Sequence, residues 1–229
     1  MQLRSLLLAA ALACLPVASL AAPTAPIEPP VPASEKTAPA KPETKPTAPS
    51  VVGKAAPEFT LKDLDGKNVK LSSFKGKVVV LEWFNPGCPY VKKSHTVGSL
   101  IDTAKKHTAK GVVWLAINSG AVGKQGHEPR MNAEAAKTWA MTHPILRDVD
   151  GAVGKAYGAT NTPHMFVIDK KGVVAYAGAI DNSPDAERKS AEGGTLINYV
   201  DAAVEAVTAG KAVKTAQTKA YGCGVKYGS

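Results

Sequence analysis

The hydrophobic pattern of the chain centres on one apolar run and the break that follows it. Residues 78–84 are apolar apart from Glu82, which predicts a strand buried on both faces. Asn85-Pro86-Gly87 interrupts this run, and residues 91–104 then carry apolar side chains at helical spacing. Cys88 is therefore expected at a strand-to-helix turn, at or near the first residue of a helix.

A thiol at the start of a helix meets unpaired backbone N–H groups and the positive end of the helix dipole, which favour an anion. Such a position lowers a cysteine pKa from about 8.5 into the range of roughly 3.5–7.5. Lys92 and Lys93 act in the same direction. A reactive thiolate is the reading that we favour for Cys88, and a small buried residue is the alternative.

The rest of the pattern predicts a mixed β-sheet with helices on both faces, which is an α/β fold. Asp150 is expected to cap a short helix. The other predicted elements are short strands near 59–61 and 69–71, a second buried strand over 112–117, a helix over 132–141, a short strand at 145–146, a hairpin over 165–176 and an amphipathic helix over 195–208.

The two ends of the chain differ from its middle in composition. Residues 1–22 read as a secretory signal peptide whose apolar run is too short to span a bilayer. Residues 23–50 form a disordered linker rich in proline and alanine, residues 51–209 form one domain, and residues 210–229 form a tail that carries Cys223. The product is expected to be secreted, and periplasmic if the source is a Gram-negative bacterium.

The net charge and the number of cysteines limit which partners and which chemistry are expected. Removing residues 1–22 lowers the formal net charge from +9 to +8, because Arg4 is their only charged residue, and it also removes Cys14. The positive charge is spread along the chain, so no nucleic-acid partner is expected. In an exported protein, the remaining Cys88 and Cys223 suggest either a disulfide or a nucleophile with a resolving thiol.

The order of predicted elements, with a cysteine at the first long helix and Thr162-Pro163 before the hairpin, resembles the thioredoxin-like superfamily. The match covers residues 51–209 and is closest to its redoxin branch of exported thiol–disulfide oxidoreductases and peroxiredoxin-like proteins. Three segments carry the resemblance: 57–61 (PEFTL), 76–81 (GKVVVL) and 162–169 (TPHMFVID). The resemblance implies a thioredoxin-like fold with a central mixed sheet.

The resemblance also implies roles for single residues. Cys88 matches the attacking thiol of the Cys-x-x-Cys motif, and Lys92 matches the lysine after that motif. Glu82 matches the buried carboxylate that relays protons in thioredoxins, although an edge-strand carboxylate facing water is the alternative. Pro163 matches the cis-proline, and Thr162 the residue whose backbone pairs with a substrate chain.

The motif departs from the family at its second cysteine, because Cys88-Pro89-Tyr90 is followed by Val91. The usual local disulfide cannot form without that cysteine. Peroxiredoxins place their peroxide-reactive cysteine at the same second position within a Pro-x-x-x-Thr/Ser-x-x-Cys motif, which is also missing here. Both ordinary dithiol exchange and ordinary peroxidase activity are therefore in doubt.

Cys223 could compensate for the missing cysteine. It lies between glycines in a tail that we expect to be flexible enough to fold back. Three relations to Cys88 stay open: Cys223 resolves a mixed disulfide formed at Cys88, the two form a permanent structural link worth roughly 4–5 kcal/mol, or they never meet.

The histidines and metal ligands give weaker predictions. His164 follows Pro163 and could approach the Cys88 thiol, or it could face solvent or pack on the sheet. Cys88, His164, Met165 and Cys223 would be a soft-ligand set for copper(I), but they lack the spacing of thioredoxin-fold copper chaperones. We therefore expect no metal and no cofactor. His95, seven residues after Cys88, lies too far along the helix to be its direct base, and His107, His127 and His143 are expected at the surface.

Three functions follow from these residues. The leading one is an exported thiol–disulfide oxidoreductase that acts on protein thiols or disulfides, with Cys88 as nucleophile and Cys223 as a possible resolving thiol. The alternatives are a one-cysteine thiol peroxidase, acting on a small thiol or peroxide substrate, and a non-enzymatic module that binds copper or a protein. Catalytic roles are assigned to Cys88, Cys223, Glu82 and Lys92, and substrate-binding roles to Thr162, Pro163 and His164.

Overall fold

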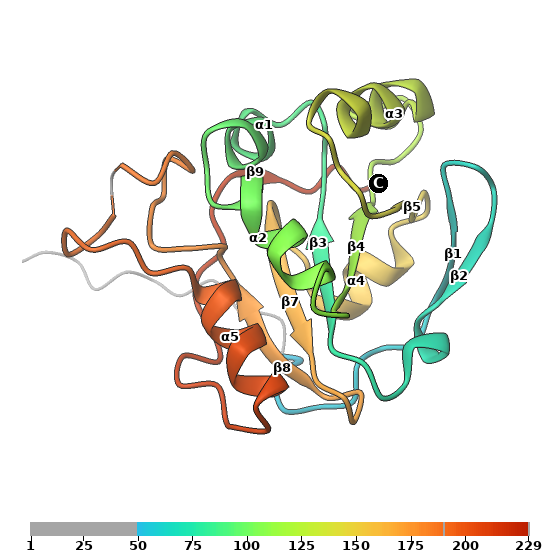
Figure 1. Cartoon of the computed structure of the whole chain (residues 1–229). Helices are drawn as coiled ribbons and strands as arrows, with labels where there is room; N and C mark the ends of the chain where they lie inside the picture. Colours follow the sequence, from blue (N-terminus) through green and yellow to red (C-terminus); the bar gives the residue numbers. More distant parts are fainter. Residues whose placement is uncertain (1–49, 190, 229) are drawn as a thin grey trace, which may run out of the picture. The chain divides into compact units, whose positions relative to one another are not determined.

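The computed structural model describes residues 50–189 and 191–228 (Figure 1). The signal peptide expected over 1–22 and nearly all of the linker expected over 23–50 lie outside the described residues. Within the described part, no helix is both long and apolar enough to cross a bilayer.

A seven-stranded sheet forms the centre of the domain, in the order β2-β1-β5-β4-β3-β7-β8. Strand β3 is parallel to β4 and antiparallel to β7, so the sheet is mixed, as the sequence predicts. The strands are β1 (Thr60–Asp63), β2 (Asn68–Lys70), β3 (Val79–Trp83), β4 (Val113–Asn118), β5 (Ile145–Arg147), β7 (His164–Ile168) and β8 (Val174–Gly178).

The two faces of β3 bury different side chains because successive residues of a strand point to opposite faces. Leu81 and Trp83 pack in one apolar cluster with residues of helix α4 (Ala152–Tyr157). Val80 packs in another with α2 (Leu100–Thr108) and α5 (Tyr199–Thr208). Helices therefore cover both faces, and the central strand is fully buried.

The helix predicted across 91–104 is two helices in the structure. Helix α1 (Pro89–Thr96) ends where the backbone N–H groups of Val97 and Gly98 both donate to Lys93 O, and α2 starts at Leu100. A β-carbon at Gly98 would collide with Ala186 O, so the chain needs glycine at this break. Val97, which we predicted on the apolar face, is half exposed.

Other boundaries shift by a few residues. Helix α3 (Pro129–Thr138) begins three residues earlier than predicted, and α5 begins four residues later because Asn198 accepts a hydrogen bond from Asp201 N and caps it. After β2 the chain forms a 3₁₀ helix, η1 (Leu71–Phe74). Gly151 is the cap residue of α4, although the Asp150 carboxylate does accept a hydrogen bond from Ala152 N.

The C-terminal tail is ordered, contrary to the flexible tail that we expected. After α5 it returns past α1 (Figure 1) and forms strand β9 (Cys223–Gly224), which pairs antiparallel with β6 (Asn161–Thr162) in a separate two-stranded sheet. In this register Cys223 lies opposite Thr162. The pairing fixes a distant segment beside the start of α1.

Candidate active site

Cys88 occupies the N-cap of α1, as the sequence predicts. The turn before it is held by Asn85, whose side chain accepts a hydrogen bond from Gly87 N and whose carbonyl accepts one from Cys88 N. Pro89 follows in the first turn, where a missing N–H costs nothing. The break in the apolar run therefore places the sulfur at the N-terminus of a helix.

Two other segments of the chain enclose the Cys88 sulfur. Cys88 Sγ donates to Thr162 O at 3.1 Å, across the loop in which the Thr162-Pro163 peptide is cis. The Cys223 side chain packs against the apolar cluster that contains Cys88, close enough to lower the pKa of Cys88. Cys88 is fully buried and Cys223 is partly exposed, and both are free thiols in this state. The structure therefore brings together the two cysteines of the described chain.

The two thiols differ in acidity. Burial raises the pKa of Cys88, but the neighbouring Cys223 thiol, the backbone N–H of Val91 and the Thr162 side chain outweigh burial and lower that pKa below its ordinary value. Burial, with the neighbouring Cys88 second, raises the pKa of Cys223 to about 11. Cys88 is thus the group that ionises first, and the neighbouring Cys223 thiol stabilises its thiolate.

The side chains of Lys92, Lys93 and His164 have no hydrogen bond to the Cys88 sulfur among the described residues. The Lys92 side chain is exposed, and Lys93 pairs with Glu187 at 2.6 Å. His164 is buried, and its Nδ1 accepts a hydrogen bond from Thr160 N. It packs on the sheet against Phe166, which is one of the two alternatives left open by the sequence.

The copper(I) set suggested by the sequence does not converge. His164 and Met165 are successive residues of β7, so their side chains lie on opposite faces of the sheet. Met165 packs in the cluster with α2 and α5, whereas the His164 ring lies against Phe166 in the other cluster. Among the described residues, no group of three or more His, Cys, Asp or Glu side chains has the geometry to hold a metal ion.

Glu82 is a fully buried carboxylate on the central strand, so the edge-strand alternative is wrong. Its Oε1 lies 2.7 Å from His95 Nε2, and its Oε2 accepts from Trp114 Nε1 at 3.1 Å. Burial raises the pKa of Glu82, but His95 and these hydrogen bonds reverse that effect and hold it below its usual range. The carboxylate thus anchors α1 through His95, about two helical turns beyond Cys88.

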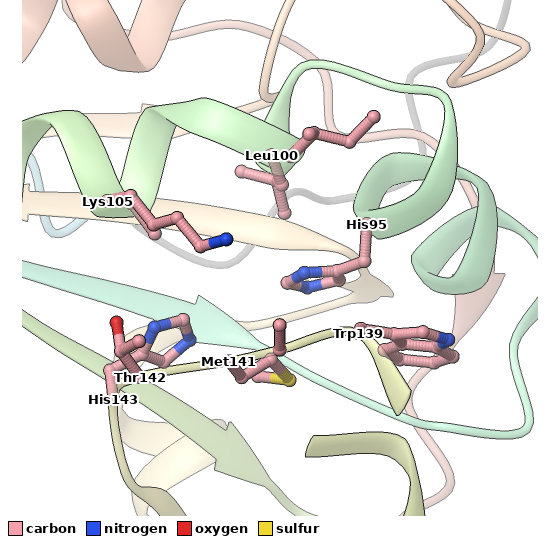
Figure 2. A pocket seen from close by; sticks show the side chains of 10 residues that line it. His95, Leu100, Lys105, Trp139, Met141, Thr142 and His143 are labelled. Carbon is pink, nitrogen blue, oxygen red and sulfur yellow. The ribbon is translucent and has the colours of Figure 1, made fainter. Parts of the chain in front are cut away.

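His143 lies beside this pair and is buried, although we expected it at the surface. Its Nε2 is 3.9 Å from Glu82 Oε2, and neither ring nitrogen has a hydrogen-bond partner in the described part of the chain. Figure 2 shows His95 and His143 pointing toward one small cavity of about 10 Å³, with Trp139 stacked on His95. Burial lowers the pKa of His143 to about 4.

His107 is also buried, where it contacts Asp201 at 2.6 Å, and His127 is partly buried. The surface position that we expected is therefore wrong for His107 and His143, whereas His127 keeps part of its surface exposed. The sequence around these histidines does not indicate their partners. His107 contacts Asp201, which is 94 residues away, and His127 contacts the carbonyl of Gly120, which is 7 residues away. A missed signal does exist in the tail: residues 221–227 alternate apolar side chains with Gly or Lys, the period of a strand.

Residues 51–194 match the Redoxin family. The chain belongs to this family. Its structure is thioredoxin-like, and it superposes on a hypothetical protein of Sinorhizobium meliloti 1021 with a TM-score of 0.67 at 27% identity, covering 78% of this chain and 95% of that one. An uncharacterized conserved protein of Geobacillus kaustophilus gives a TM-score of 0.66 at 29% identity, covering 77% and 92%.

Curated relatives of this redoxin include two kinds of enzyme. The thiol-disulfide oxidoreductase ResA of Geobacillus thermodenitrificans is 35% identical over 125 residues, which are 54% of this chain and 66% of the relative. Peroxiredoxin Q of Triticum aestivum is 32% identical over 135 residues, covering 54% and 57%. The redoxin therefore spans just under two thirds of the length of the first and somewhat more than half of the second.

Replacing the donor at residue 223 tests the source of the Cys88 acidity. We expect Cys223→Ala to raise the pKa of the Cys88 thiol, because the variant removes the neighbouring thiol that stabilises the thiolate. Cys223→Ser keeps a hydroxyl donor and should shift the pKa less. Thiolate absorbance at 240 nm, followed against pH in the reduced variants, measures both values. Equal midpoints in the two variants would contradict this account.

Stability against pH tests the buried state of His143. Its pKa is about 4 when folded and near 6.5 when unfolded, so the unfolded state binds more protons between these values. The contribution of His143 is complete above pH 6.5 and is lost as the pH falls toward 4. The size of this loss is about 3 kcal/mol of unfolding free energy, at about 1.4 kcal/mol per pKa unit.

We therefore expect His143→Gln to flatten the pH dependence of the unfolding free energy between pH 7 and 4. Urea unfolding at several pH values measures this slope. The comparison is between slopes, so a general loss of stability in the variant does not affect it. A variant whose slope equals that of the unmodified protein would show that His143 has the same pKa in the folded and unfolded states, which contradicts this account.

Proposed function

We propose that this redoxin is a thiol–disulfide oxidoreductase whose redox pair is Cys88 and Cys223. The observation that carries the proposal is that both cysteines meet at Thr162: Cys88 Sγ donates to Thr162 O, and the pairing of β9 with β6 places Cys223 opposite Thr162. The similarity to thiol-disulfide oxidoreductase ResA supports the same reaction class. Val91 occupies the position of the second cysteine of the Cys-x-x-Cys motif, and Cys223 supplies the missing thiol from a distant part of the chain.

The reaction proceeds in two exchanges. The Cys88 thiolate attacks one sulfur of a partner disulfide, a Cys88–partner bond forms, and one partner thiolate leaves and takes up a proton. Cys223 loses its proton to solvent and attacks the Cys88 sulfur, which releases the second partner thiolate and forms the Cys88–Cys223 disulfide. The partner gains two electrons and the redoxin loses two. The reverse sequence oxidises a dithiol partner.

Four of the remaining predicted residues have three different roles. Thr162 and Pro163 border the sulfur, and the backbone of Thr162 is the edge where a substrate chain would pair. Glu82 acts as a positioning residue for α1 through His95, because its carboxylate hydrogen bonds to His95 and Trp114. Lys92 is exposed and adds positive charge near the start of the helix.

The substrates and the compartment are part of the same proposal. We assign protein thiols and disulfides as the partners, on the basis of the exchange chemistry of the pair. Export is supported by the signal-like pattern of residues 1–22, and a cycling disulfide suits an oxidising compartment.

Trapping the mixed disulfide tests the assignment of roles. We expect Cys223→Ser to accumulate a covalent adduct at Cys88 with the disulfide-linked dimer of a peptide that has the sequence of residues 217–228, because the second exchange is blocked. Cys88→Ser should form no such adduct and should lower the exchange rate at least a hundredfold. Non-reducing electrophoresis and peptide mass spectrometry identify the linked residue. Adducts found at Cys223 in the Cys88→Ser variant, with exchange retained, would reverse the roles.

Thiol peroxidase activity is a second candidate, favoured by the similarity to peroxiredoxin Q. In that reaction the Cys88 thiolate attacks a peroxide oxygen, which gives a sulfenate and releases water or an alcohol. The Cys223 thiol then condenses with the sulfenic acid, forming the disulfide and a second water.

Peroxide treatment separates the two candidates. One equivalent of hydrogen peroxide followed by dimedone should label Cys88 in Cys223→Ser to less than about a tenth of the protein if disulfide exchange is the function, because the peroxiredoxin motif is missing around Cys88. Stoichiometric labelling within seconds would favour the peroxidase instead. Mass spectrometry of the Cys88 peptide gives the yield.

A further inference from the structure

Strand β9 occupies the edge at which a partner of Cys88 would have to dock. Asn161 and Thr162 are paired with Gly224 and Cys223. The backbone N–H of Val225 also donates to Thr160 O at 3.0 Å, and Asn161 Nδ2 donates to Gly222 O. With this strand in place the Cys88 side chain is fully buried. A partner disulfide therefore cannot reach the sulfur while β9 is seated.

Tyrosine anchors on either side hold this short strand. Tyr221 Oη donates to the buried carboxylate of Asp181 at 3.0 Å. Tyr227 Oη donates to Ala159 O at 2.8 Å, and its ring lies under Lys155 Nζ. Only two residues between these anchors have strand geometry, so little regular pairing has to break for the strand to leave.

Gly222 shows which residue can precede a cysteine that is paired with Thr162 of β6. Its φ is 98°, a conformation that side chains rarely adopt. A β-carbon there would collide with Thr162 O and lie 3.2 Å from Pro163 Cδ. A β-carbon at Gly224 would meet nothing closer than Thr160 O at 4.0 Å. The residue before the docked cysteine must therefore be glycine, whereas the residue after it is unrestricted.

We propose that β9 is a tethered occupant of the docking edge, which must leave before a protein partner can reach Cys88. The partner is an extended segment with glycine directly before its cysteine, because it takes the register that residues 222 and 223 now hold. This inference rests on the proposed role of Cys88 as the reacting thiol. When the Cys88–Cys223 bond is closed, the same strand is covalently locked on the edge and excludes a second partner.

Alkylation of Cys88 tests whether β9 covers the sulfur. The parent is the full chain with Cys223→Ser, treated with iodoacetamide at pH 9 so that ionisation does not limit the rate, with the modified Cys88 peptide quantified by mass spectrometry. We expect the parent to react at least a hundredfold more slowly than the urea-unfolded protein. Adding Gly222→Ala should raise the rate at least tenfold, and the matched control Gly224→Ala should stay within twofold of the parent.

A peptide supplied in trans tests the partner chemistry. The peptide corresponds to residues 217–228 with serine at position 223 and is added to the Gly222→Ala variant. We expect it to restore slow alkylation of Cys88, because it fills the vacated edge. The same peptide with alanine at position 222 should give no protection. Protection by both peptides would overturn the requirement for glycine.

Three results would overturn the gating role itself: rapid alkylation of the parent, no acceleration by Gly222→Ala, or equal acceleration by Gly224→Ala. If Gly222→Ala does not fold, Tyr227→Ala is the alternative variant, because it loosens the tail outside β9. It should also accelerate the alkylation of Cys88, and an unchanged rate would contradict the proposal. These readouts involve no disulfide exchange. Alkylation rates as expected, together with no mixed disulfide, would support the gating role of β9 and contradict the proposed function.

Discussion

The backbone of Thr162 is the constraint on which the site depends. Its carbonyl accepts the Cys88 thiol at 3.1 Å, and its strand partner is Cys223. One residue therefore fixes both sulfurs, although they are separated by more than a hundred residues in the chain. The burial of Cys88 and the raised pKa of Cys223 both follow from this arrangement. A change that moves the Thr162 loop would alter the sulfur environment and the tail together.

A second constraint positions the helix that carries Cys88. The sheet buries Glu82 with no access to solvent, so its charge has to be compensated inside the protein. His95 supplies that compensation from α1, and Trp114 supplies a further hydrogen bond from β4. Removing one partner of a buried pair typically costs about 3–5 kcal/mol, because the other is left uncompensated. The pair thus ties the helix to the central strand.

The sequence predicted the parts of the fold that depend on local patterns. The apolar run of β3, the break at Asn85 and the hairpin of β7 and β8 each have a clear period and boundary. The position of Cys88 followed from these. The break between α1 and α2 was missed, because the apolar spacing continues across Gly98 and only tertiary contact with Ala186 shows why the helix ends there.

The candidate site was harder to predict because its partners come from distant segments. Sequence reasoning left three relations open between Cys88 and Cys223, and β9 went unrecognised although the tail alternates in a strand-like way. The burial of His143 has no local signal, since its surroundings come from β3, β4 and α2. Contacts of this kind are set by the packing of the whole domain rather than by the period of any one segment.

The reduction potential of the Cys88–Cys223 couple tests the central claim most directly. The full-length protein is equilibrated in glutathione buffers of defined potential, alkylated, and the oxidised fraction is quantified by mass spectrometry. A reversible couple between about −270 and −120 mV, the range of thiol–disulfide exchange proteins, is the predicted result. A bond that stays closed below about −300 mV would mark a structural link, and a pair that forms no bond at any potential would contradict the assignment of Cys223 as the second redox thiol.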